Sequence, residues 1–203
     1  MAAKETQQPI DGKILRSIRA RRSAQAFSAK DFVDIGRPDA IRQALSRLAR
    51  DGALRRIRRG VYDLPRQHPI LGQTAPDPTA IVTSLLRDTG AQWQFTGAYA
   101  ANQLGLSEQV PAKIIIYTDA SPRKIRLGKL TLTFRKVVPR SLLGAGRPAG
   151  LVVQALRHLK RHLTPRHIAQ LRQQLDADTK AELASLAPQL PAWMRPHLDD
   201  ITT

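Results

Sequence analysis

The chain contains 203 residues, with 33 Lys and Arg against 16 Asp and Glu, so its formal net charge is +17. Cysteine is absent, which excludes disulfide bonds, zinc–cysteine sites and a thiol nucleophile. Because the sequence shows neither an apolar run as long as a membrane span nor a signal-peptide core, we expect a cytoplasmic protein without a membrane partner. The pI of about 11.4 predicts affinity for polyanions.

Two helices are predicted before residue 37. The first runs from about residue 11 to 22, and its apolar side carries Ile14, Leu15 and Ile18. The second is indicated by Ser28 followed three positions later by Asp31, the pattern of a capping box, and it ends at Gly36.

The clearest element is a helix over residues 38–50. Pro38 suits its first turn, and Gly52 suits the left-handed position just past its end. Apolar residues recur at i, i+3, i+4 and i+7 and form one stripe, made of Ile41, Ala44, Leu45 and Leu48. The other side carries polar residues of the kind that contact base edges in a major groove: Arg42, Gln43, Ser46, Arg47 and Arg50.

An arginine-rich β-hairpin is predicted after this helix. Residues 54–62 form two strand-like runs around a tip near Gly60, and the hairpin carries Arg55, Arg56, Arg58 and Arg59. A polar helix followed by such a hairpin is typical of a winged helix-turn-helix, with the helix in the major groove and the wing along the backbone or minor groove. Taken singly, the two elements could be a solvated surface helix and an edge strand that its charges protect from aggregation.

A proline-rich linker divides the chain. Pro65, Pro69, Pro76 and Pro78 hold the preceding residues extended. We therefore predict a winged helix-turn-helix domain over residues 1–65 and a second domain over residues 66–203, with net charges of +8 and +9.

The second domain is predicted to mix helices and strands. The predicted helices cover residues 78–88, 97–104, 149–162, 165–175 and 180–187, and a strand covers 112–118. Trp93, Phe95 and Tyr99 are interpreted as core residues. The predicted fold class is thus α+β, an N-terminal winged helix-turn-helix followed by a mixed α/β domain with a basic β-hairpin.

This basic hairpin spans residues 124–138 and turns at Gly128. Leu130, Leu132 and Phe134 share one face, so the hairpin can bury its apolar side and leave much of its charge outside. The candidate residues for a second DNA contact, or for a contact with a toxin, are Arg123, Lys124, Arg126, Lys129, Arg135 and Lys136. A merely solvated basic surface is the third interpretation.

Two stretches carry a resemblance to a known family. Residues 44–54 and 58–62 resemble the winged helix of AbiEi-type antitoxins, the repressor partners in bacterial type IV toxin–antitoxin (abortive infection) systems. Residues 95–119, continuing into the hairpin, are similar to the second domain of that family, so the resemblance spans about residues 10–160. Residues 163–203 match no part of the family pattern.

The resemblance implies that the first domain binds repeats in the protein's own promoter. It also implies that the second domain serves antitoxicity and cooperative DNA binding, and that a nucleotidyltransferase-like toxin is encoded next door. By the shared motifs, the residues in the family's recognition-helix and wing positions are Arg42, Gln43, Ser46, Arg47 and the hairpin arginines.

The sequence indicates no catalytic or metal-binding constellation. His158 and His162 have a spacing that can chelate a metal, but no third ligand is indicated, and Asp199 and Asp200 are interpreted as solvated acids. We therefore expect no enzymatic activity, no metal and no cofactor.

The predicted function is a sequence-specific transcriptional repressor and antitoxin that acts as a monomer or dimer on double-stranded DNA. The alternatives are a DNA- or RNA-binding protein without sequence preference and a stand-alone regulator without a toxin.

Overall fold

A computed structural model describes residues 10–21, 26–69 and 72–203 of the chain. The chain divides into two compact units, Met1–Asp88 and Thr89–Thr203. Each unit contains both helices and a β-sheet, which confirms the predicted α+β class.

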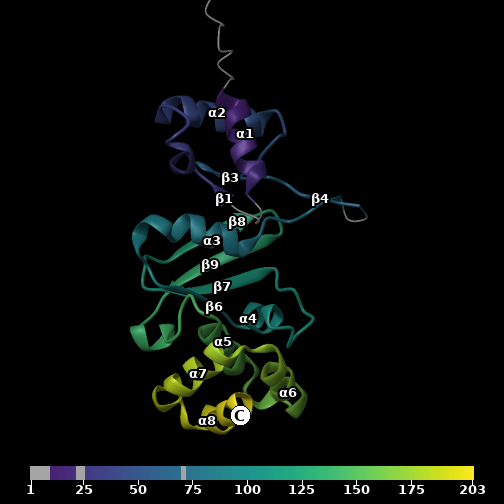
Figure 1. Ribbon diagram of the computed structural model, residues 1–203, viewed down its shortest axis with the longest axis vertical. Coiled ribbons are helices and arrows are strands. Elements are labelled where there is room, and N and C mark those ends of the chain that lie inside the picture. The colour runs from purple at the N-terminus through teal and green to yellow at the C-terminus, as the bar shows by residue number, and fades with distance from the viewer. Residues whose placement is uncertain (1–9, 22–25, 70–71) are drawn as a thin grey trace, which may run out of the picture. The chain divides into compact units, whose positions relative to one another are not determined.

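The first unit places two crossing helices over a small antiparallel sheet with strand order β1-β3-β2 (Figure 1). Its α-helices are α1 (Ile10–Ala20), α2 (Pro38–Arg50) and α3 (Pro78–Leu86), and η1 (Ala29–Phe32) and η2 (Arg87–Thr89) are 3₁₀ helices. Its strands are β1 (Ala26–Phe27), β2 (Arg55–Arg58), β3 (Val61–Asp63), β4 (Gln67–His68) and β5 (Gly72–Gln73). One apolar core joins α1, η1, α2 and the sheet, built from Ile14, Ile18, Phe27, Phe32, Ile41, Ala44, Leu45, Leu48, Leu54 and Tyr62.

Helix α2 has the predicted bounds and the predicted buried stripe. Pro38 lies in the first turn, where its missing N–H leaves no intrahelical bond unmade. The four predicted apolar residues are all buried, and Gly52 adopts a φ of 76°, as expected for a residue that follows a helix end. The apolar stripe therefore determines which face of α2 remains outside.

The segment before α2 is shorter and tighter than predicted. Ser28 and Asp31 form the expected capping interaction, because the Ser28 N–H donates to Asp31 Oδ2 at 2.7 Å. This interaction caps a 3₁₀ turn, η1, and not the predicted helix that reaches Gly36. The i→i+3 hydrogen-bond pattern of a 3₁₀ helix continues after η1, because the Ile35 N–H donates to the carbonyl oxygen of Phe32. The first helix ends at Ala20, and the predicted last residue, Arg22, lies outside the described residues.

Helix α3 lies in the first unit, whereas the sequence placed it in a second domain that begins at residue 66. It packs against β1, and Asp77 caps it by accepting a hydrogen bond from the Thr79 N–H at 2.9 Å. The predicted linker contains a short antiparallel pair, in which Gln67 lies opposite Gln73. The division after Asp88 thus replaces the predicted boundary after residue 65, because this segment folds back onto the first unit.

The second unit is built on a four-stranded sheet with order β6-β7-β9-β8, in which β7 and β9 are parallel and the other neighbours are antiparallel. Its strands are β6 (Trp93–Thr96), β7 (Lys113–Thr118), β8 (Arg123–Leu127) and β9 (Leu130–Lys136). Its α-helices are α4 (Ala98–Gln103), α5 (Pro148–Leu159), α6 (Pro165–Gln174), α7 (Ala177–Leu186) and α8 (Arg195–Thr202). Short 3₁₀ turns are η3 (Pro139–Leu142), η4 (Lys160–His162), η5 (Ala187–Gln189) and η6 (Ala192–Met194).

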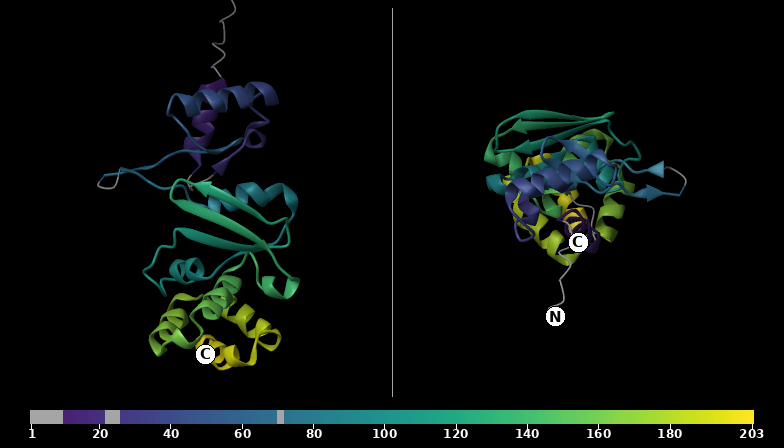
Figure 2. Two further views of the ribbon diagram at one scale, coloured as in Figure 1. Left: turned by 180° about the vertical axis from the view of Figure 1, so that it is seen from behind. Right: turned by 90° about the horizontal axis from the view of Figure 1, so that it is seen from above.

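The C-terminal helices form a second core with α4 and α5 (Figure 2). Helix α7 begins three residues before the predicted start because the Asp176 carboxylate accepts a hydrogen bond from the Thr179 N–H at 2.8 Å and so caps it. Helix α8 was not predicted, since its 8 residues with two buried side chains are too short for a recognisable period. Phe95 and Tyr99 are buried with their ring centroids 4.6 Å apart, which confirms their interpretation as core residues, whereas Trp93 is only half-buried.

Candidate nucleic-acid interface

The outer face of α2 carries the residues that the sequence selected for base and phosphate contacts. All five candidate side chains are exposed, namely Arg42, Gln43, Ser46, Arg47 and Arg50. They are held in place from below, because Ala44, Leu45 and Leu48 between them are buried in the core. Arginine, glutamine and serine side chains on one exposed helix face can donate and accept hydrogen bonds at base edges.

Each arginine on α2 also has a carboxylate partner. Arg42 pairs with Asp39 and Arg50 lies 3.6 Å from Asp51, and both pairs are exposed and local to the helix or its end. Exposed pairs of this kind contribute at most about 1 kcal/mol, so a phosphate or a base can replace the carboxylate.

Arg47 is held differently, by an acid on another helix. Its Nη2 and Nε donate to the two carboxylate oxygens of Asp11 at 2.7 and 3.2 Å. These hydrogen bonds and the charge of Asp11 raise the pKa of Arg47 above its ordinary value. The two-point contact orients the guanidinium toward α1, so a base or phosphate that approaches the Nε edge of Arg47 would compete with Asp11.

The β2–β3 hairpin presents three of its four arginines to solvent. Arg56, Arg58 and Arg59 are exposed, and the two strands join through Gly60, whose φ of 78° permits the tight turn. The guanidinium carbon of Arg56 lies 5.9 Å from the centroid of the Tyr62 ring. The hairpin therefore presents cations at a narrow exposed tip, whereas its strand β3 is buried.

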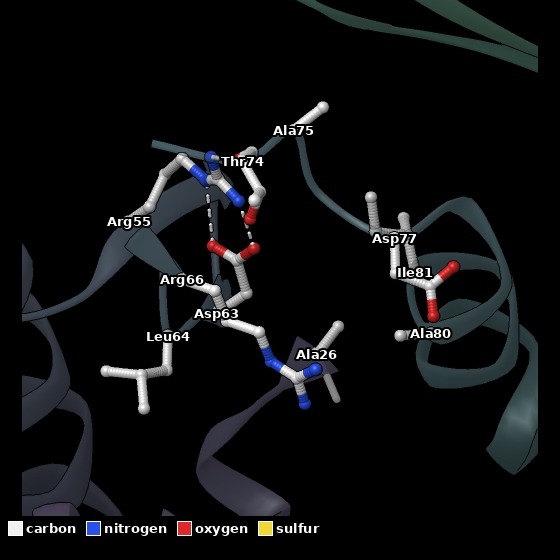
Figure 3. A pocket seen from close by; sticks show the side chains of 10 residues that line it. All are labelled: Ala26, Arg55, Asp63, Leu64, Arg66, Thr74, Ala75, Asp77, Ala80 and Ile81. Atoms are coloured by element: carbon white, nitrogen blue, oxygen red, sulfur yellow. Dashed lines mark hydrogen bonds and ion pairs between the residues drawn. The ribbon is translucent and has the colours of Figure 1, made fainter. Parts of the chain in front are cut away.

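Arg55 departs from the prediction that it contacts DNA. It lies opposite Asp63 in the strand register, and its Nε donates to Asp63 Oδ1 at 2.9 Å (Figure 3). Its Nη1 also donates to the carbonyl oxygen of Thr74 at 2.6 Å. Because these contacts use the guanidinium inside the unit, we remove Arg55 from the candidate interface. The cavity beside it is about 50 Å³, too small for more than a water or two.

A buried carboxylate fixes η1, which packs against α2. Asp31 accepts hydrogen bonds from the Ser28 N–H at 2.7 Å and from Arg87, and Arg21 lies 3.8 Å away. Burial raises the pKa of Asp31, but the hydrogen bonds from Ser28 and Arg87 and the charge of Arg87 outweigh this effect and lower the pKa below its ordinary value. Sequence reasoning used Asp31 only as a cap and missed both arginine contacts.

The second basic hairpin divides its charges between the two faces of the sheet. Leu132 and Phe134 are buried as predicted, and Arg123 lies on their face with its guanidinium carbon 4.6 Å from the Phe134 ring centroid. Lys136 alternates onto that face as well, at the end of β9. The opposite face carries Lys124, Arg126 and Arg135, all exposed, and Lys129 is exposed beside the turn at Gly128.

One further cation, Lys113, lies on the same face as Lys124, Arg126 and Arg135. It is exposed at the start of β7, opposite Thr131, which in turn lies opposite Arg126. The sequence contained the signal, since Lys113 alternates with the buried Ile114 and Ile116. The order of the strands, which brings Lys113 beside the hairpin, could not be derived from the sequence.

No group of three or more His, Asp or Glu side chains suited to a metal ion occurs in the described ranges 10–21, 26–69 and 72–203. Over the same ranges, no helix combines the length and apolar character needed to cross a membrane.

Comparison with known proteins identifies the family. Residues 13–183 match the family described as "Family of unknown function (DUF6088)". The chain belongs to the DUF6088 family. This DUF6088 chain is also similar to the crystal structure of the RV2827C protein from Mycobacterium tuberculosis, with 20% sequence identity and a TM-score of 0.48 over 95% of this chain and 77% of that one. No curated protein matches its sequence.

Proposed function

We propose that the first unit is a winged helix-turn-helix that binds double-stranded DNA. The observation that carries the proposal is the exposed polar face of α2 followed directly by the arginine tip of the β2–β3 hairpin, both mounted on one apolar core. In this proposal α2 is the recognition helix, the hairpin is the wing, and β1 completes the small sheet behind them.

The interface residues have different roles. Gln43, Ser46 and the arginines Arg42 and Arg50 on α2 contact base edges or the nearest phosphates. The hairpin arginines Arg56, Arg58 and Arg59 contact phosphates, because long cationic side chains at a narrow tip supply charge rather than fixed geometry. Arg47 contacts DNA through the guanidinium donors that Asp11 does not use, or in exchange with Asp11.

We further propose that the protein represses its own promoter and acts as an antitoxin of the type IV class. This part rests on the resemblance of residues 44–54, 58–62 and 95–119 to AbiEi-type antitoxins. The partner would then be a nucleotidyltransferase-like toxin, and two copies of the chain would occupy repeated half-sites. The net charge of +17 favours one alternative, binding to nucleic acid without sequence preference.

Fluorescence anisotropy at fixed salt tests the DNA proposal. The full chain is titrated against a duplex from the region upstream of its own gene and against a shuffled duplex of the same composition. We expect tighter binding to the upstream duplex, and a loss of about 1–3 kcal/mol in Arg42→Ala if that side chain contacts a base. Arg166→Ala, which removes an exposed cation from α6, is the matched control.

Equal affinity for the two duplexes would mean that the chain binds nucleic acid without sequence preference, which is the alternative.

The antitoxin proposal has a separate test, in which the chain is co-expressed with the product of the neighbouring reading frame. Rescue of growth supports it. If growth is inhibited and not rescued, or the neighbouring product is harmless, the chain is a stand-alone regulator.

A further inference from the structure

A groove of about 580 Å³ lies within the first unit. Its walls are the outer face of α2, the β2–β3 hairpin, η1 and the last turn of α3. This volume lies within the range of about 300–1,000 Å³ that small-molecule sites occupy.

The groove has an apolar floor and a cationic rim. Leu45, Val61 and Tyr62 line it and are each less than 9% exposed, so they form its floor. The rim carries four cations and three hydroxyl groups, from Lys30, Arg42, Arg56, Arg59, Ser28, Ser46 and Ser84. The acid that lines the groove, Asp88, is already paired with Lys30 at 2.7 Å.

This combination matches a ligand with two chemical parts. The cations and hydroxyl groups that line the groove can bind a phosphate, because charge-assisted hydrogen bonds to an anion are the strong ones. The apolar floor covers a planar ring, and Arg56 already lies over the Tyr62 ring there. Neither part alone explains why buried apolar side chains and four cations line the same groove.

We propose that this groove binds a small phosphorylated ligand of nucleotide size, with the phosphate at the rim and the ring on the floor. Arg42, Ser46, Arg56 and Arg59 would then serve two ligands, since they also belong to the proposed DNA interface. The small ligand and DNA therefore exclude each other. This second step rests on the proposed function, whereas occupation of the groove does not.

Calorimetric titration of the full chain with AMP tests occupation of the groove, with inorganic phosphate as the comparison. We expect saturable AMP binding and weaker binding of phosphate. Lys30→Gln, which removes a rim cation outside the proposed DNA interface, should weaken AMP binding about tenfold, the equivalent of one charge-assisted hydrogen bond.

A matched pair of variants on α3 separates filling of the groove from general disturbance of the helix. Ser84→Tyr places a ring in the groove and should abolish AMP binding, while Thr83→Tyr adds the same ring at an exposed neighbour that does not line the groove. Thermal unfolding of both variants checks that they fold. Absence of AMP binding at millimolar concentration, or equal loss in the two variants, would overturn the proposal.

Competition between AMP and DNA distinguishes the proposal of a nucleotide groove from the proposal of a DNA interface. AMP should displace the upstream duplex from the wild-type chain in the anisotropy assay, and Ser84→Tyr should resist this displacement. If AMP binds but neither duplex does, the groove is a nucleotide site and the proposal of DNA binding is wrong. If phosphate binds as well as AMP, the groove accepts a phosphate group of DNA and the nucleotide ligand is excluded.

Discussion

The arginines of the first unit divide into two groups according to what their guanidinium groups contact. Arg55 and Arg47 are fixed by Asp63 and Asp11 through two-point contacts, whereas Arg58 and Arg59 lie at the exposed tip of the hairpin. Residue type alone does not separate these groups, because all four occur in similar basic surroundings in the sequence. The position of the nearest carboxylate in the fold decides which arginine remains available to an anion.

Asp31 should stabilise the first unit in a pH-dependent way. Its pKa is lowered in the folded chain, so its contribution is fully present above the ordinary aspartate value of about 3.9 and is lost as the pH falls through the folded-state pKa. Asp31→Asn removes a buried acceptor of charge-assisted hydrogen bonds and should lower the free energy of unfolding at pH 7 by about 1–3 kcal/mol. Urea unfolding at pH 7 and at decreasing pH measures both effects.

The matched control is Asp34→Asn, which changes an exposed acid three residues away. It should leave the unfolding free energy nearly unchanged at every pH. The difference between wild type and Asp31→Asn should begin to narrow as the pH falls below about 4 and should disappear below the lowered folded-state pKa, where the carboxyl is protonated in both the folded and the unfolded chain. A difference that stays constant with pH would show that the carboxylate charge is not the cause.

At the scale of elements, the β2–β3 hairpin combines an internal anchor with an exposed tip. Asp63 and Tyr62 are buried on β3, while the tip residues Arg59 and Gly60 are exposed. A wing built in this way should bind DNA through charge. We expect Arg58→Ala and Arg59→Ala each to reduce the slope of log affinity against log salt concentration by about 1, and to weaken all duplex sequences alike.

Arg55→Ala is the matched control for this prediction, since it removes an arginine from the same hairpin. It should lower the free energy of unfolding, because Asp63 is only 8% exposed and loses its partner. Its salt slope should equal that of the wild type. An unchanged slope in both tip variants would mean that the hairpin is merely solvated.

At the scale of the whole molecule, both units are strongly basic. Residues 1–88 carry 17 Lys and Arg against 9 Asp and Glu, and residues 89–203 carry 16 against 7. The net charges are therefore +8 and +9, so net charge does not favour either unit over the other as the partner of a polyanion. Four exposed cations of the second unit lie on one face of β7, β9 and β8, namely Lys113, Lys124, Arg126 and Arg135.

Reversing charge on this face should weaken DNA binding by the full chain. Lys124→Glu combined with Arg126→Glu changes the two exposed cations of β8, and anisotropy should report lower affinity for both the upstream and the shuffled duplex. Arg161→Glu with Arg166→Glu is the control, because it changes the net charge equally at exposed positions elsewhere in the unit. Equal losses of DNA affinity in the two double variants would mean that the net charge of the chain, and not this face, causes the effect. If DNA binding persists and rescue from the toxin is lost, the face belongs to the toxin interface.

Elements whose signals are local could be predicted from the sequence. Helix α2 has its predicted ends and buried stripe, because Pro38, Gly52 and the 3.6-residue period all act within a few residues of one another. The same holds for the turns at Gly60 and Gly128, where positive φ favours glycine. The exposed candidates on α2 follow from the same period, since burying one stripe leaves the opposite face outside.

Tertiary structure alone decided the partners that are distant in the sequence. The two-residue strand β1 has no period of its own and exists because it pairs with β3, and α3 joins the first unit through its contact with β1. Contacts between Arg47 and Asp11, and between Arg87 and Asp31, join residues 36 and 56 positions apart. Such pairings depend on loop closure and on the packing of the whole core, and neither leaves a repeating pattern along the chain.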